Sequence, residues 1–118
     1  MVNENVQKYI GMGVSEIYGA IALAESDCEL CDIAEAGIRI GHFSIVESAF
    51  AERNAMAFRA EGVGEREVDI MKSEFLRGNY NVGHVKPSRN DLERTLTGAM
   101  IEGRTDSASR ITKLLRGN

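Results

Sequence analysis

The residues of this chain best suited to chemistry are its two cysteines and two histidines. Cys28 and Cys31 stand three positions apart in an acidic segment, and His42 follows eleven residues later. Thiolates and imidazoles are ligands that zinc prefers, and a pair at i and i+3 on one helix supplies half of a tetrahedral site. His84 would be the fourth ligand, provided that the chain folds back between Cys31 and His42. Cys28, Cys31, His42 and His84 are therefore a candidate zinc site.

A redox role for the two thiols is disfavoured by their surroundings. The start of a helix lowers the pKa of a thiol, but the carboxylates of Asp27, Glu29 and Asp32 oppose thiolate formation. Buried free cysteines usually behave as small apolar side chains. We therefore expect packed, structural cysteines and no cofactor, with zinc as the alternative.

The C-terminal part of the chain is a candidate for contact with DNA. Residues 86–118 carry seven basic against four acidic side chains, whereas residues 1–85 carry seven against fourteen, a net charge of −7. An acidic body repels phosphates, so only the tail suits nucleic acid. Residues 92–116 resemble a helix-turn-helix pattern, although a plain helical hairpin is the alternative. The basic side chains that such a motif would turn toward DNA are Arg104, Arg110, Lys113 and Arg116.

Two glycines and one arginine are candidates for an interface between copies of the chain. Gly37 and Gly41 are four residues apart, a spacing that lets a second helix cross closely. Arg53 lies on the apolar side of its predicted helix, where an interface ion pair would suit a planar guanidinium. Close packing within one chain is the alternative for the glycines.

Most of the sequence has the apolar periodicity of helices. Between residues 4 and 24, isoleucines and valines recur every three or four positions and predict one helix. Ser26 and Glu29 form a capping-box pattern that begins a second helix at 27. Unbroken to residue 60, this helix would be ~50 Å long. It must therefore break near Gly37 or Gly41, or project into a partner.

Three further helices are expected in the C-terminal half. One spans 64–77; the next begins after Ser88 or Asn90 and ends at Gly103, with Leu92, Leu96, Ala99 and Met100 facing inward. The last is capped by Thr105 or Asp106 and turns Ala108, Ile111, Leu114 and Leu115 to the core. The alternative for segments 38–46 and 79–85 is a short two-stranded element.

These features predict a mostly α-helical bundle of four to five helices, formed by residues 1–118 as a single domain. The polar N-terminus lacks the pattern of a signal peptide, and no apolar run is long enough for a membrane span, so we expect a cytoplasmic protein without membrane contact. The function expected first is that of a non-enzymatic interaction or regulatory module acting as a homo-oligomer. The alternatives are a small DNA-binding regulator and a metal-binding protein or small enzyme.

Overall fold

The computed structural model describes residues 3–117, which form seven α-helices, one short 3-10 helix and no strand. The predicted mostly α-helical fold is thus confirmed, with more helices than expected, and the two-stranded alternative is wrong because 38–46 and 79–85 form helices and turns. The elements are α1 Glu4–Ile10, α2 Val14–Leu23, α3 Asp27–Ile40, α4 Phe43–Ala60, α5 Glu65–Leu76, η1 Tyr80–Val82, α6 Arg89–Glu102 and α7 Thr105–Leu115.

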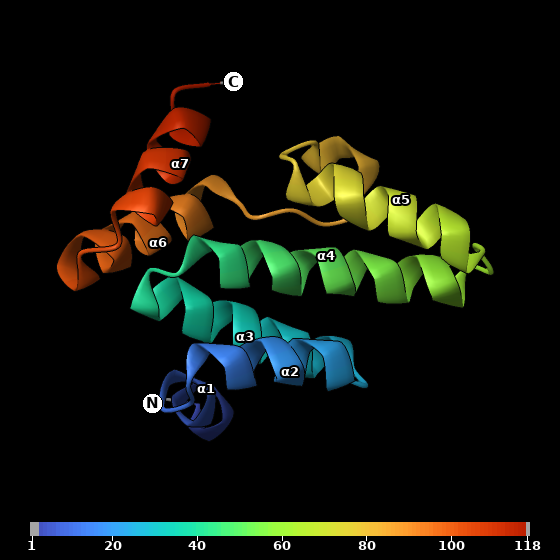
Figure 1. Ribbon diagram of the computed structural model, residues 1–118, viewed down its shortest axis with the longest axis horizontal. Coiled ribbons are helices and arrows are strands. Elements are labelled where there is room, and N and C mark those ends of the chain that lie inside the picture. The colour runs from blue at the N-terminus through green and yellow to red at the C-terminus, as the bar shows by residue number, and fades with distance from the viewer. Residues whose placement is uncertain (1–2, 118) are drawn as a thin grey trace.

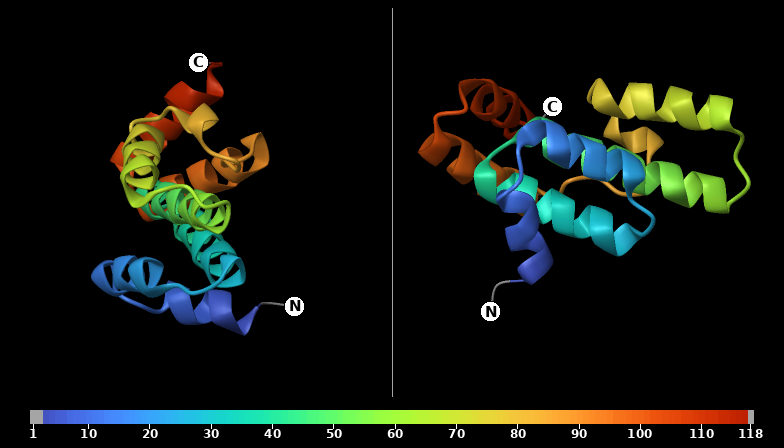
Figure 2. Two further views of the ribbon diagram at one scale, coloured as in Figure 1. Left: turned by 90° about the vertical axis from the view of Figure 1, so that its right-hand side faces the viewer. Right: turned by 60° about the horizontal axis from the view of Figure 1, so that its bottom comes forward.

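Helix α4 is the centre of the arrangement. In Figure 1, α3 and α2 lie on one side of α4, and α5 runs along the other. The hairpin of α6 and α7 packs at the end where α4 begins, and α1 and α2 form an outer layer in the left view of Figure 2. Within residues 3–117, none of the helices combines the length and apolar composition required to span a membrane.

The single helix expected over 4–24 is wrong, because the chain breaks at Gly11–Gly13. Gly11 ends α1, and Gly13 has an extended backbone with ψ 155°. The carboxylate of Glu16 then accepts a hydrogen bond from the Gly13 N–H at 3.2 Å and starts a new helix. As a result α2 turns independently of α1, and Val14, which periodicity placed inward, is 39% exposed.

The break expected within 27–60 occurs at Gly41. The Ser26 hydroxyl accepts from the Glu29 N–H at 3.2 Å and caps α3 as predicted. Gly41 ends α3 in the left-handed conformation at φ 69°, where an L side chain is strained. The fold-back shortens the segment to two packed helices, so its length no longer argues for a partner copy.

The C-terminal helices agree closely with expectation. Ser88 caps α6 in a reciprocal box with Asp91, and α6 ends at Gly103 as predicted. The cap of α7 is Arg104 rather than Thr105 or Asp106, and Met100, expected inward, is 70% exposed.

One apolar core runs through the molecule between α3 and α4. It extends to α1 and α2 on one side and to α5 and α7 on the other. Its largest fully buried apolar side chains are Phe43, Phe75, Ile17, Leu30, Ile33, Ile45 and Ile111. This shared core fixes the positions of the helices relative to one another.

Candidate functional site

The four residues predicted as zinc ligands lie in three separate places. Cys28 and Cys31 are in the first turns of α3, His42 is at the junction of α3 and α4, and His84 stacks on Phe58 with ring centroids 4.5 Å apart. In the part of the chain that the structure describes, no group of three or more His, Cys, Asp or Glu residues is arranged to hold a metal ion. The predicted fold-back exists, but it does not assemble this ligand set.

The cysteines also differ from the expected packed pair. Cys31 is half-buried, whereas Cys28 is exposed, so the expectation of packing is wrong for Cys28. The Cys31 thiol donates to a carboxylate oxygen of Asp27 at 3.6 Å. Burial, followed by the neighbouring Asp27, raises the pKa of the Cys31 thiol, because both disfavour its thiolate.

The predicted interface residues make contacts within one chain. Arg53 donates from Nε to Asp27 at 2.8 Å and lies over the Phe50 ring at 5.1 Å, which ties α4 to the start of α3. Gly37 is buried, and a Cβ there would meet Ile45 at 2.9 Å. At Gly41 a Cβ would meet the backbone of Ala99 at 2.0 Å. Both glycines thus permit close packing inside the chain.

Two of the four basic residues predicted for DNA contact are engaged within the chain. Arg104 donates from Nε to the Ile40 carbonyl at 2.9 Å, at the C-terminal end of α3. Arg110 forms a two-pronged ion pair with Glu47, described below. Lys113 and Arg116 are exposed. The helix-turn-helix hypothesis therefore retains half of its proposed contacts.

A buried carboxylate that sequence analysis missed joins three elements. Glu47, in α4, is 2% exposed. Arg110 of α7 donates to both of its oxygens, through Nη1 to Oε1 and through Nη2 to Oε2 at 2.7 Å. The hydroxyl of Tyr80, in η1, donates to Oε2. Both carboxylate oxygens are thus hydrogen-bonded, and this cluster, which we call the Glu47 clamp, links α4 to α7 and to η1.

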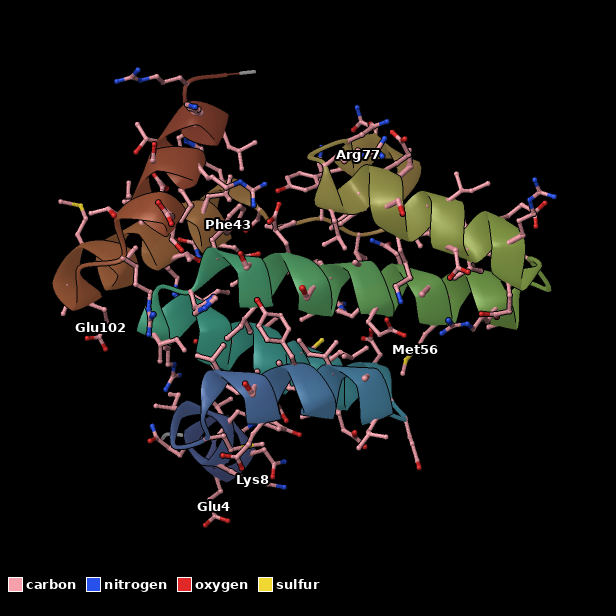
Figure 3. The ribbon with its side chains drawn as sticks, in the orientation of Figure 1. Glu4, Lys8, Phe43, Met56, Arg77 and Glu102 are labelled. Atoms are coloured by element: carbon pink, nitrogen blue, oxygen red, sulfur yellow. The ribbon has the colours of Figure 1, made fainter. Side chains whose placement is uncertain are left out.

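The surroundings of this clamp reinforce it. The guanidinium of Arg110 lies 5.2 Å from the ring centre of Phe43, the first residue of α4, which Figure 3 shows on the side of α4 that faces α7. Burial and the hydrogen bond to Glu47 strongly raise the pKa of Tyr80, so its hydroxyl stays protonated and donates. The backbone N–H of Phe43 also donates a hydrogen bond to Oγ of Ser107 at 3.1 Å.

A second buried polar residue, Asn54, fixes the segment between α5 and α6. Its side chain is fully buried, accepts from the backbone N–H groups of His84 and Val85 at 2.7 and 2.8 Å, and donates to the Val85 carbonyl at 2.9 Å. Gly83 packs against the amide so closely that a Cβ would lie 2.4 Å from Nδ2. In sequence, only the position of Asn54 on the apolar side of its helix could have drawn attention to it.

A polar cavity of about 410 Å³ opens where α4 and α7 begin. It is lined by both signs of charge, with Arg104 beside Glu102 and Asp106. The Nδ1 atom of His42 is buried there without a hydrogen-bond partner. Burial, followed by the charge of Arg104, lowers the pKa of His42. This mixed lining selects no single class of ligand.

The outer surface of α2 is unusually apolar for an exposed helix. Only Ile17 and Ile21 of its ten residues are buried, and Glu16 is its single charged residue. Val14 and Tyr18 are 39% and 37% exposed, and Leu23 is 80% exposed. We define the α2 face as the exposed residues Val14, Ser15, Tyr18, Gly19, Ala22 and Leu23, which cover about half of the helix circumference.

A groove of about 440 Å³ continues from the α2 face toward α5. It is lined by Tyr18 and Ala22 of α2, Leu76 of α5 and the small residues Ser48 and Ala51 of α4, together with the charged side chains of Glu52, Arg59 and Lys72. Single exposed apolar residues are ordinary on protein surfaces, but a contiguous apolar patch beside a groove is typical of a protein contact. The α2 face and this groove are the surface best suited to binding another helix.

Comparison of the chain with protein-family models, with curated proteins and with solved structures found no match.

Proposed function

We propose that this protein is a non-enzymatic interaction module that acts as a homo-oligomer, with the α2 face as its contact surface. The observation that carries the proposal is the exposure of Val14, Tyr18 and Leu23 on a helix with one charged residue. Leaving these side chains in water costs free energy that a partner recovers at roughly 25 cal/mol per Å² of apolar surface buried. The buried polar residues support structural roles rather than catalytic ones, because Glu47 is hydrogen-bonded to Arg110 of α7 and Asn54 to the backbone of Val85.

The charge distribution favours contact at this surface. Residues 1–85 carry a net charge of −7, so two copies repel each other over most of this region. The α2 face itself is uncharged, and Glu16 lies beside it rather than on it. Two copies can therefore approach through α2 with little desolvation of charge.

Sedimentation velocity between ~1 and ~100 μM tests the proposal, because a contact made mainly by one ten-residue helix is small and its Kd falls in the micromolar range. The wild type should associate with increasing concentration. Leu23→Glu should remain monomeric, since it puts a charge into the contact. Ile101→Glu is a matched control: Ile101 is 78% exposed against 80% for Leu23, but it lies on α6.

A wild type that stays monomeric over the whole range contradicts the proposal. Association that Ile101→Glu abolishes and Leu23→Glu leaves intact contradicts the choice of α2. The α-helical circular dichroism signal of both variants should match the wild type, because neither side chain is buried.

A further inference from the structure

The two free cysteines of the chain lie one helical turn apart at the start of α3. Cys28 is exposed and Cys31 is half-buried, so solvent reaches both residues, although to different degrees. Residues three apart on a helix share a face, and helix geometry places their Cα atoms about 5 Å apart. A disulfide bond joins Cα atoms that are roughly 4.4–6.8 Å apart. The fold therefore holds the two thiols at a separation that a bond between them can span.

The position of the pair at a helix start also favours closure. The first N–H groups of an α-helix have no carbonyl partner within the helix, so the backbone there can adjust without breaking the helical hydrogen-bond pattern. Cys28 is the second residue of α3, and its N–H is one of these groups. A small rotation that brings the Cys28 sulfur toward Cys31 therefore disturbs α3 less than the same change in its middle.

The charges around the pair are more balanced than the acidic sequence suggests. Asp27, which accepts from the Cys31 thiol at 3.6 Å, is paired with Nε of Arg53 at 2.8 Å. Burial raises the pKa of the Cys31 thiol, and the charge of Arg53 opposes that rise. A thiol of higher pKa is also the stronger nucleophile once it is deprotonated. Cys28, the accessible thiol, is thus suited to meet an oxidant first, and Cys31 to close the bond.

We propose that Cys28 and Cys31 form a redox-sensitive dithiol, which a low-molecular-weight disulfide converts to an intramolecular disulfide. The Cys28 thiolate attacks one sulfur of the small disulfide, whose S–S bond breaks and releases one small thiolate. Cys31 then gives its proton to water, and its sulfur attacks that of Cys28 and displaces the second small thiolate. The protein thus loses two electrons and two protons, and the small disulfide becomes two thiols. This site does not depend on the self-association of α2.

Intact mass spectrometry of the reduced protein after treatment with oxidised glutathione tests the site. The wild type should lose two hydrogens, carry no glutathione and keep no thiol that reacts with iodoacetamide, and dithiothreitol should restore both thiols. Cys31→Ser should stop at a glutathione adduct on Cys28, because no second thiol displaces the glutathione. Cys28→Ser should form its adduct several-fold more slowly than Cys31→Ser, because Cys31 is less accessible and its pKa is raised.

The double variant Cys31→Ser/Glu35→Cys is a matched control for the spacing. Glu35 is half-buried like Cys31, but it lies about 10.5 Å along α3 from Cys28, so this pair should end as separate glutathione adducts. A wild type that keeps both thiols, remains a mixed disulfide or forms covalent dimers overturns the proposal. Closure of the control pair at the wild-type rate overturns the role of α3 in placing the thiols. Equal adduct rates in the two single variants overturn the assignment of Cys28 as the attacking thiol.

Discussion

Removing Arg110 should destabilise the protein much more than its exposure suggests. The Arg110 side chain is 43% exposed, yet it neutralises a Glu47 side chain that is only 3% exposed. Breaking a buried ion pair from one side costs about 3–5 kcal/mol, because an uncompensated charge remains inside. Here water reaches the arginine side of the pair and Tyr80 still donates to the carboxylate, so we expect Arg110→Met to cost about 2–3 kcal/mol.

Removing the other partner should be milder. In Glu47→Leu the buried charge disappears, and the exposed Arg110 guanidinium can turn into solvent. The remaining cost is mainly the Tyr80 hydroxyl, which loses its acceptor, so we expect about 1–2 kcal/mol. The double variant should cost clearly less than the sum of the two, with a coupling of at least ~1 kcal/mol.

Urea unfolding at pH 7, followed by circular dichroism, measures these differences. With a slope of about 1.5 kcal/mol/M, a loss of ~2.5 kcal/mol lowers the midpoint by roughly 1.7 M. Arg66→Met removes an exposed arginine of α5 and should stay within ~0.5 kcal/mol of the wild type. A midpoint of Arg110→Met equal to that of Arg66→Met, or a larger loss of stability in Glu47→Leu than in Arg110→Met, would contradict this expectation.

Three further predictions follow from the other buried contacts. Asn54→Ala should cost about 2–4 kcal/mol, because it leaves the His84 and Val85 backbone groups without partners, and amide hydrogen exchange at Val85 should accelerate; unchanged exchange would contradict this. The pKa of His42 is lowered in the folded protein, so the unfolded chain takes up a proton below pH ~6.5 before the folded protein does. The urea midpoint should therefore fall as the pH is lowered from ~6.5 to ~5.5. In His42→Asn this fall should be smaller. An equal fall of the urea midpoint in His42→Asn would mean that another titrating group causes the pH dependence. Gly41→Ala should prevent cooperative folding or cost more than ~3 kcal/mol, because a Cβ would overlap the backbone of Ala99; a wild-type urea midpoint would refute that packing.

The helices of this protein could largely be predicted because their signals are local. Ser26 and Ser88 are recognisable N-caps of α3 and α6, and Gly41 and Gly103 mark the C-terminal ends of these two helices. The break between α1 and α2 was missed because the apolar period continues across it: Ile17 and Ile21 keep the spacing set by Val6. Periodicity also overstates burial, since Val14 and Met100 have the helical spacing of core residues but are 39% and 70% exposed.

The polar clusters could not be predicted because their partners are distant in sequence. Glu47 is 63 residues from Arg110 and 33 from Tyr80, and Asn54 is 31 from Val85. Nothing in the sequence distinguishes such a glutamate from a solvated one. Gly19 has the same ambiguity: a glycine in a helix suggests close packing, but only the structure shows that an added Cβ there would meet nothing within 4 Å.

Sedimentation equilibrium of Gly19→Gln beside the wild type tests the self-association of α2 most directly. Glutamine favours the helix and has open space around it within one chain, so the monomer should be about as stable as the wild type or more so. At ~100 μM the wild type should approach twice its mass of 12.9 kDa, while Gly19→Gln should stay at the monomer mass. Equal association of the two proteins would contradict it, because a larger side chain at the centre of the contact must hold two helices apart.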